Sequence, residues 1–314
     1  MVCNLRELAF PMAPEDFTGR YRNGEIVVVR APQPDKLAGL FPWDTINSLF
    51  DGDCLQPDRM AVMRDGMRLP DWLWSAARPG AGPDASSLHG LLRQGATILI
   101  DRIDELVPAI RRLTAALQAH FEARVSANTY LSFRRGSALA AHFDDHDIIV
   151  AQIHGAKRWW FYDRREAFPV AIDRPGRGGP PAPAAPVRDD LLRPGDVMVV
   201  PRGEWHRTAV EGDVSVHLTI GIRPARGLFL IQRCLDEARK DPLFRQDVPH
   251  YRGPAALAAH EAELKRRLAE IVARVSLADL VADAASPLPA PPEVPRRPQG
   301  AAARFHFPVL DEPG

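Results

Sequence analysis

The stretch from Ala141 to Phe161 reads AHFDDHDIIVAQIHGAKRWWF and carries three histidines and three aspartates within its first fourteen residues. The largely apolar run 148–153, between Asp147 and His154, predicts a buried strand. Side chains two residues apart on an extended chain share one face, so His142 and Asp144 can point the same way. An imidazole beside a carboxylate suggests a metal site, although an isolated His-x-Asp pair is more often simply exposed to solvent.

The composition is that of an ordinary globular protein, with 314 residues, 46% hydrophobic and 25% charged. This length suits one large domain or two smaller ones. Because 40 basic residues balance 40 acidic ones, no overall attraction to nucleic acid or to an anionic membrane is expected. The apolar runs are too short to cross a bilayer and the first residues do not resemble a signal peptide, so we expect a cytoplasmic protein.

The cysteines offer no metal site. Cys3, Cys54 and Cys234 lie far apart and show no zinc or redox spacing. Any metal must therefore be held by histidines and carboxylates.

The pattern of the chain changes several times. From residue 37 to about residue 121 short helical and strand patterns alternate, whereas after residue 124 several short β runs follow one another, which favours a barrel or sandwich. The Pro- and Gly-rich stretch between Arg174 and Val187 is predicted to be an exposed loop. From residue 227 the chain reads as amphipathic helix, and after residue 285 it is rich in proline.

A second motif, PGDVMVVPRGEWH, ends in His206. Together with the first stretch it resembles the two sequence motifs of cupins, with Asp144 at the position of the first motif's second histidine. His206, on a neighbouring strand, can complete a facial triad with His142 and Asp144. A triad of two imidazoles and one carboxylate leaves coordination positions open and is typical of non-haem Fe(II) oxygenases, whereas a structural metal site closes its shell.

Other polar residues lie close to the proposed triad in sequence. His146 continues the alternation and is expected to support a metal ligand or to line the pocket, with metal ligation itself as the alternative. Asp145 and Asp147 fall on the opposite face and are expected to orient neighbours or to meet solvent. His154 is not expected to be a ligand, and His217 either lines the pocket or satisfies a hydrogen bond in the core.

Lys157 follows Gly155 and Ala156, which we expect to form a turn into the next strand. From there its side chain can reach into the barrel as a lone cation, which is costly unless an anion meets it. The distal carboxylate of 2-oxoglutarate would be such an anion. The alternative is that Lys157 and Arg158 are both solvated turn residues.

The stretch HFDDHDIIVAQIHGAKRWWFY resembles the JmjC-type cupins of the ribosomal-oxygenase group, whose pattern is His-x-Asp, an apolar strand with Gln, and then Gly-x-Lys/Arg-x-Trp. Upstream, MRDG, GATILIDRIDELVP and ANTYLSF resemble the same family, so the resemblance covers roughly Met1–Pro224. It implies an α+β fold: a double-stranded β-helix, or cupin/JmjC jelly roll, with α/β N-terminal elements and a C-terminal helical region.

The resemblance also implies a non-haem iron dioxygenase that uses Fe(II), 2-oxoglutarate and O₂. In this family the catalytic iron ligands correspond to His142, Asp144 and His206, and the salt-bridge partner of 2-oxoglutarate corresponds to Lys157. Further contacts to the co-substrate are expected from three residues at matching inward positions: Asn128, Tyr130 and Thr219.

The family pattern divides the chain into three parts. Residues 1–224 are expected to form the JmjC/cupin oxygenase domain, with its core barrel at about 124–224. Residues 225–285 form a helical region that matches the family's dimerisation region, and residues 286–314 form a Pro-rich tail. No winged-helix domain of the kind found in ribosomal oxygenases is expected after the helices.

The hypothesis for function is hydroxylation of an amino-acid side chain in a protein or peptide. The alternative is hydroxylation of a small metabolite, a natural product or a modified tRNA base, and a non-catalytic metal-binding cupin is disfavoured. A homodimer is a further expectation, and neither a membrane nor a nucleic acid is an expected partner.

Overall fold

The structure is a computed structural model that describes residues 2–51, 55, 58–75, 83–134, 140–173, 181–286 and 307. The chain divides into two compact units. The first comprises residues 1–120, 125–222 and 288–314, and the second comprises residues 121–124 and 223–287.

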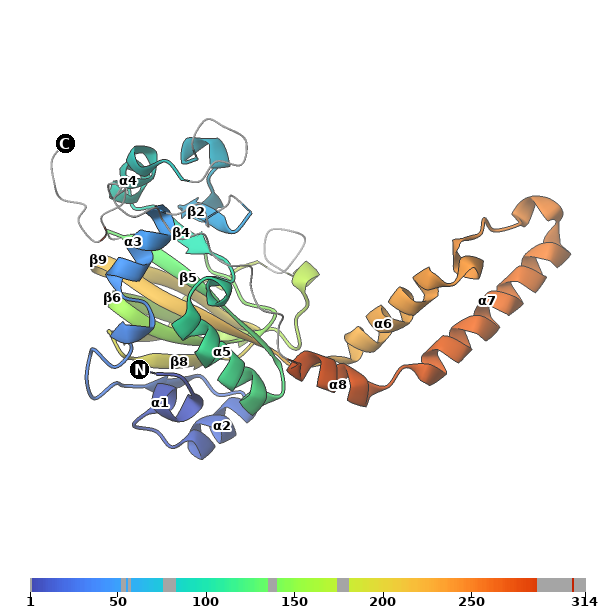
Figure 1. The fold of residues 1–314 in the computed structure, drawn as a ribbon, viewed down its shortest axis with the longest axis horizontal. Coiled ribbons are helices and arrows are strands. Elements are labelled where there is room, and N and C mark those ends of the chain that lie inside the picture. Colours follow the sequence, from blue (N-terminus) through green and yellow to red (C-terminus); the bar gives the residue numbers. More distant parts are fainter. Residues whose placement is uncertain are drawn as a thin grey trace. The chain divides into compact units, whose positions relative to one another are not determined.

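The first unit is built on a nine-stranded sheet among the described residues (Figure 1). The strands are β1 Val27–Val29, β2 Met60–Arg64, β3 Met67–Arg68, β4 Thr97–Ile100, β5 Arg124–Phe133, β6 Asp147–Arg165, β7 Pro186–Leu192, β8 Val197–Val200 and β9 Glu204–Arg223. Their order is β1-β8-β6-β9-β5-β4-β2-β3, with β7 pairing with β6 beside this path. The run of antiparallel strands after residue 124 follows the prediction from the sequence.

The long strands β6 and β9 correct that prediction in one respect. The sequence predicts two strands separated by a turn at Gly155, but β6 passes through this residue and only shifts its register with β9 there. Gly155 has a φ of 60°, and a Cβ atom on it would lie 1.8 Å from the carbonyl oxygen of Val214. Only glycine fits this close approach. Lys157 therefore lies on the same strand as the apolar run, just beyond the irregularity, and is not a turn residue.

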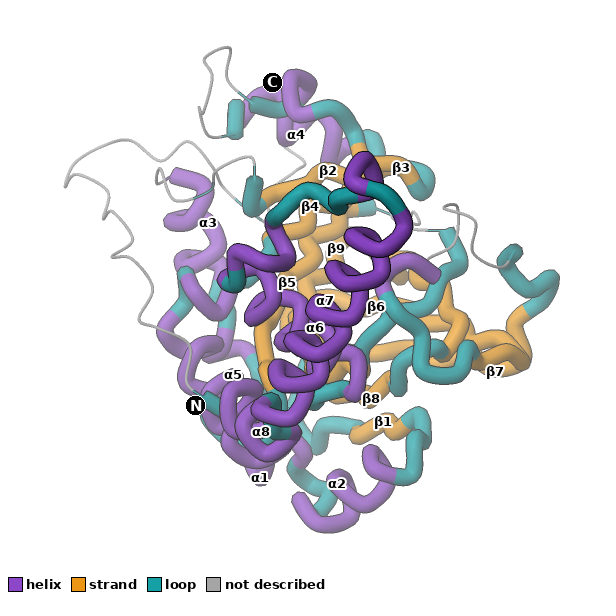
Figure 2. The backbone as a smooth tube through the Cα atoms, turned by 90° about the vertical axis from the view of Figure 1, so that its right-hand side faces the viewer, coloured by secondary structure: helices purple, strands orange, loops and turns teal. Residues whose placement is uncertain are grey.

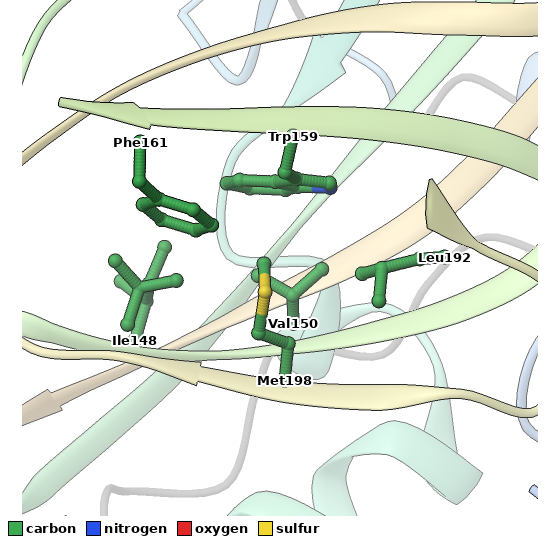
Figure 3. Close-up of a cluster of buried hydrophobic side chains, with 7 residues drawn as sticks. Ile148, Val150, Trp159, Phe161, Leu192 and Met198 are labelled. Carbon is green, nitrogen blue, oxygen red and sulfur yellow. The ribbon is translucent and has the colours of Figure 1, made fainter. Parts of the chain in front are cut away.

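An apolar cluster fills the space between the two parts of β6 (Figure 3). Trp159 and Phe161, from the later part of the strand, face Ile148 and Val150 from its first part, with Met198 of β8 beside them. All five side chains are buried, and each contributes on the order of 1.5–3 kcal/mol by leaving water. The interior of the barrel is consequently walled by apolar groups.

The helices of the first unit carry the predicted apolar spacing. In α5, for example, Ile110, Leu113 and Leu117 are buried at intervals of three and four residues. The helices are α1 Leu5–Ala9, α2 Pro14–Arg22, α3 Trp43–Asp51, α4 Ala85–Arg93 and α5 Pro108–Phe121, with 3-10 turns at Ala38–Leu40, Asp71–Leu73, Ile103–Glu105 and Ala171–Asp173.

The second unit is helical (Figure 2). Its helices are α6 Gly227–Lys240, α7 Pro254–Arg274 and α8 Leu277–Ala285, with 3-10 turns at Pro242–Arg245 and His250–Arg252. Cys234 and Ala238 of α6 pack against Ile271 of α7. The predicted helix does not run on to residue 285, because Ser276 caps a new helix by accepting hydrogen bonds from the backbone N–H groups of Ala278 and Asp279. No helix in the described part of the chain is both long and apolar enough to cross a membrane.

Two predicted segments fall partly outside the described residues. Of the expected loop at 174–187, residues 174–180 are not described, and strand β7 already begins at Pro186. Of the expected tail at 286–314, the structure describes residues 286 and 307.

Phe307 is not a loose tail residue, because its side chain is 3% exposed. Its ring lies 5.1 Å from that of Phe50, 5.4 Å from that of Phe133 and 5.3 Å from that of His89, between ring centroids. The Asn47 amide holds its backbone twice: Oδ1 accepts from the Phe307 N–H at 2.7 Å, and Nδ2 donates to the Phe307 carbonyl at 3.1 Å. The aromatic pocket of α3, α4 and β5 is thus closed by a residue from the predicted tail.

Candidate metal and co-substrate site

Backbone pairing brings the predicted ligands together. The N–H of His142 donates to the carbonyl of His206 at 2.9 Å, and the N–H of His206 donates back at 2.7 Å. The N–H of Gly203 donates to the carbonyl of Asp144 at 2.9 Å. A Cβ atom on Gly203 would lie 2.0 Å from the carbonyl oxygen of Glu166, so this turn requires glycine. These contacts fix the chain before β6 against the start of β9.

Both histidines present the same ring nitrogen to the site. The Nδ1 atom of His142 lies 2.9 Å from the carbonyl oxygen of Ala140, and the Nδ1 atom of His206 lies 2.9 Å from that of Glu204. Because a carbonyl only accepts, the proton belongs on Nδ1 and the lone pair on Nε2. Burial, and then the neighbouring His142, lower the pKa of His206 to about 4. A neutral imidazole with a free Nε2 is the form that binds a metal.

The three side chains offer donor atoms that all lie within 4.8 Å of one another. Nε2 of His206 lies 3.9 Å from Oδ2 of Asp144, and the rings of His142 and His206 are 4.4 Å apart. Burial opposes the charge of Asp144, but His206 and His142 outweigh it and hold the pKa of the carboxyl below its ordinary value. Two imidazoles and one carboxylate on one side of a site fit a non-haem Fe(II) centre with open positions.

An ion pair that the sequence did not reveal supports this arrangement. Oδ1 of Asp147 accepts from the backbone N–H and the Nε of Arg202 at 2.9 and 3.1 Å, and Oδ2 accepts from Nη2 at 3.0 Å. The hydroxyl of Tyr21 donates to the same carboxylate at 3.0 Å, and burial together with this carboxylate raises the pKa of Tyr21. Since the partners lie 55 and 126 residues away in sequence, no local pattern points to them. Asp147 therefore orients a neighbour, one of the two predicted roles, by tying the start of β6 to the turn before His206.

Lys157 is buried in the interior, with 2% of its surface exposed. Among the described residues it has no acidic partner within 4.0 Å, and its ammonium lies 5.6 Å from the centre of the Tyr130 ring. Burial lowers the pKa of Lys157 to about 7. The alternative of a solvated lysine is wrong, while Arg158 does meet solvent and pairs with Asp189 and Glu211.

Of the three other candidates for co-substrate contacts, two lie in the barrel interior and one makes a structural hydrogen bond. Tyr130 lies beside Lys157, and Thr219 pairs across the sheet with Val150 of the interior cluster, so it faces the same space. Asn128 uses its Oδ1 to accept from the backbone N–H of Arg102 at 2.9 Å, which is a structural bond at the end of β4.

The remaining histidines also separate. His146 contacts Asp145 at 2.8 Å, and His154 lies 3.0 Å from the carbonyl of Phe41 through Nε2. His217, by contrast, stacks on Tyr130 inside the barrel.

Comparison with known proteins agrees with this geometry. Residues 104–228 match the sequence profile of the JmjC domain. This region is thus similar to JmjC domains. It contains all three members of the triad as well as Lys157, and the chain before and after it lies outside the match.

The chain is also similar to parts of larger proteins. It is similar to the bifunctional lysine-specific demethylase and histidyl-hydroxylase NO66 of Drosophila grimshawi, with 26% identity over 223 residues, which are 70% of this chain and 30% of that protein. The protein of the same name from Drosophila sechellia is 31% identical over 138 residues, 43% of this chain and 21% of that protein. The chain thus spans about a third or less of the length of these relatives.

Among solved structures, the Escherichia coli ribosomal oxygenase YcfD in complex with cobalt and 2-oxoglutarate aligns with a TM-score of 0.53. The identity is 18%, and the alignment covers 84% of this chain and 68% of YcfD. At this identity the likeness concerns the fold, and it confirms the prediction of an α+β JmjC/cupin barrel.

Proposed function

We propose that this chain is an Fe(II)- and 2-oxoglutarate-dependent dioxygenase that hydroxylates an amino-acid side chain of a protein or peptide. One observation carries the proposal: a triad suited to iron and a buried lysine with no acidic partner among the described residues lie in the same apolar barrel. A metal-binding protein without catalysis would need the triad but would have no use for a buried cation.

Each group has a distinct task. His142, Asp144 and His206 would hold the iron, which supplies O₂ chemistry: 2-oxoglutarate and O₂ yield succinate and CO₂, and the second oxygen atom enters a C–H bond of the substrate. Lys157 would pair with the distal carboxylate of 2-oxoglutarate and so fix its depth in the barrel. The apolar wall, including Trp159, keeps water away from the reacting groups.

The proposed substrate class rests on the relatives. Proteins similar to this chain are named for histidyl hydroxylation, lysine demethylation and ribosomal oxygenation, all of which concern macromolecules. A small metabolite, a natural product or a modified tRNA base is the alternative substrate class. We further propose the division into 1–224, 225–285 and 286–314, a homodimer formed through the helical part, and a cytoplasmic location.

The first test concerns the metal. His142→Ala, Asp144→Ala and His206→Ala should each lose Mn²⁺ binding in calorimetry and lose succinate formation, because a site with two protein ligands holds a labile divalent metal poorly. His250→Ala, at an exposed site in the second unit, is the control. Unchanged metal affinity in the His206 variant would reject the assignment of the triad as the metal site.

The second test concerns the substrate. The iron-loaded protein is incubated with 2-oxoglutarate and a lysate of its own source, and peptides and metabolites are searched for the addition of one oxygen atom. Oxygen on a peptide supports the proposal. Oxygen only on a small molecule or a nucleoside selects the alternative.

A further inference from the structure

The imidazole of His217 lies buried in the barrel. His217 is on β9, 2% exposed, and its Nδ1 has no hydrogen-bond partner among the described residues. Leaving a buried polar atom unpaired costs about 1–3 kcal/mol, so such atoms are rare and call for an explanation. Of the two roles that the sequence leaves open, a core hydrogen bond from Nδ1 directly to a described protein group is therefore excluded.

The ring is held firmly in one orientation. It stacks on Tyr130 with 4.9 Å between centroids and 4° between planes, and it meets Trp159 edge to face at 6.0 Å. Tyr130 is also the ring over which the Lys157 ammonium lies. His217 and Lys157 therefore contact one shared aromatic wall. The Nε1 atom of Trp159, a donor, is buried as well and has no hydrogen-bond partner in the described part of the chain.

The charge state of His217 suits a neutral donor. Burial, and then the nearby Lys157, lower the pKa of His217 well below its ordinary value. The imidazole thus stays neutral, and it can carry its proton on Nδ1 without placing a second cation beside Lys157. In this arrangement Lys157 supplies the positive charge, and His217 supplies a directional hydrogen-bond donor.

We propose that His217 is a positioning residue for the co-substrate: its Nδ1–H donates a hydrogen bond to the distal carboxylate that Lys157 neutralises. The inference rests on the proposed function and adds to it a second residue that binds the distal carboxylate of 2-oxoglutarate. A competing explanation exists on the neighbouring strand, where Gln152 pairs with His217 across the sheet. The buried Oε1 atom of Gln152 also has no hydrogen-bond partner within the described ranges. A water between the two would satisfy both atoms with no role for the ligand.

The test is a change in selectivity between two ligands. 2-Oxopentanoate has the same keto acid end as 2-oxoglutarate but a methyl group in place of the distal carboxylate. Both are titrated by calorimetry into Mn²⁺-loaded protein, and the ratio of their dissociation constants is compared among variants. His217→Leu should weaken 2-oxoglutarate about tenfold to a hundredfold, as expected for a hydrogen bond to a charged group, and should leave 2-oxopentanoate unchanged.

Matched variants separate positioning from packing. His217→Asn keeps a donor near the position of Nδ1 and should retain the ratio of dissociation constants within a few fold. His217→Gln moves the donor outward and should lose the preference for 2-oxoglutarate. If the leucine variant does not fold, this pair decides. His154→Leu removes a histidine that bonds to a protein carbonyl, and its ratio should equal that of the wild type.

Each outcome has one meaning. A leucine or glutamine variant with the wild-type ratio, or one that weakens both ligands equally, overturns the inference in favour of the bridging water. If Lys157→Ala also leaves the ratio unchanged and the wild type shows no preference for the diacid, the proposed function itself fails. If the preference for 2-oxoglutarate is lost in Lys157→Ala but kept in the His217 variants, the proposed function stands and only the positioning role of His217 is rejected.

Discussion

Binding of 2-oxoglutarate should take up a proton at Lys157. In the ligand-free protein burial holds the pKa of this ammonium at about 7, from an ordinary value of 10.5. A bound carboxylate favours the charged form and raises the pKa again. The lysine is thus charged in the complex but, at pH 8, only about one-tenth charged before binding, so about 0.9 proton should enter per site.

The sign of the pH dependence follows directly. Below pH 7 the ammonium is already formed and affinity is at its full value. Above pH 7 each unit should weaken binding about tenfold, or ~1.4 kcal/mol, until the pKa of the complex is reached. Both carboxylates of the ligand are ionised throughout this range and add no slope.

Calorimetry in two buffers measures this uptake. Mn²⁺-loaded protein is titrated at pH 8 in phosphate and in Tris, whose ionisation enthalpies differ strongly, and the difference in observed enthalpy gives the number of protons. Lys157→Arg is the matched control, because a guanidinium stays charged and should take up none. Equal enthalpies in both buffers for the wild type would refute the reasoning, since the cation would then be formed before binding.

Three further results are expected. Lys157→Ala should lose two to four decades of 2-oxoglutarate affinity, about 3–5 kcal/mol as for a broken buried ion pair, and should keep its metal; wild-type affinity would reject this anchor. Phe307→Ala should lower the free energy of unfolding by about 3–5 kcal/mol in denaturant titration, whereas Phe168→Ala, 85% exposed, should change it little; equal effects would contradict the pocket. Light scattering should give a dimer that Ile231→Glu with Leu235→Glu on the exposed apolar face of α6 converts to a monomer, and a monomeric wild type would contradict the interface.

Short-range pattern was sufficient to indicate that His142, Asp144 and His206 lie together, and insufficient to indicate what surrounds them. His142 and Asp144 are recognisable because strand periodicity places them on one face, and the second motif locates His206. The shape of β6 was not predictable, because Gly155 reads as a turn until the close approach of Val214 is known. That approach depends on Val214 of β9, which is distant in sequence, and local propensity carries no information on it.

The polar network around Asp147 could not be predicted from local sequence either. Nothing near Asp147 in sequence indicates Arg202 or Tyr21, because the bonds depend on how distant turns meet. The burial of Lys157 could be expected from its apolar neighbours on the strand. Its aromatic contact with Tyr130, by contrast, requires the order of strands in the sheet.

The contact between Asn47 and Phe307 also sets an order of events during synthesis. These residues are separated by 260 positions, so α3, α4 and β5 emerge from the ribosome long before the ring that completes their aromatic pocket. Until then Phe50 and Phe133 lack the ring of Phe307 that packs against them. Contacts between such distant positions form late, because a long loop must close first. The aromatic pocket of α3, α4 and β5 is therefore completed only once residue 307 has been made.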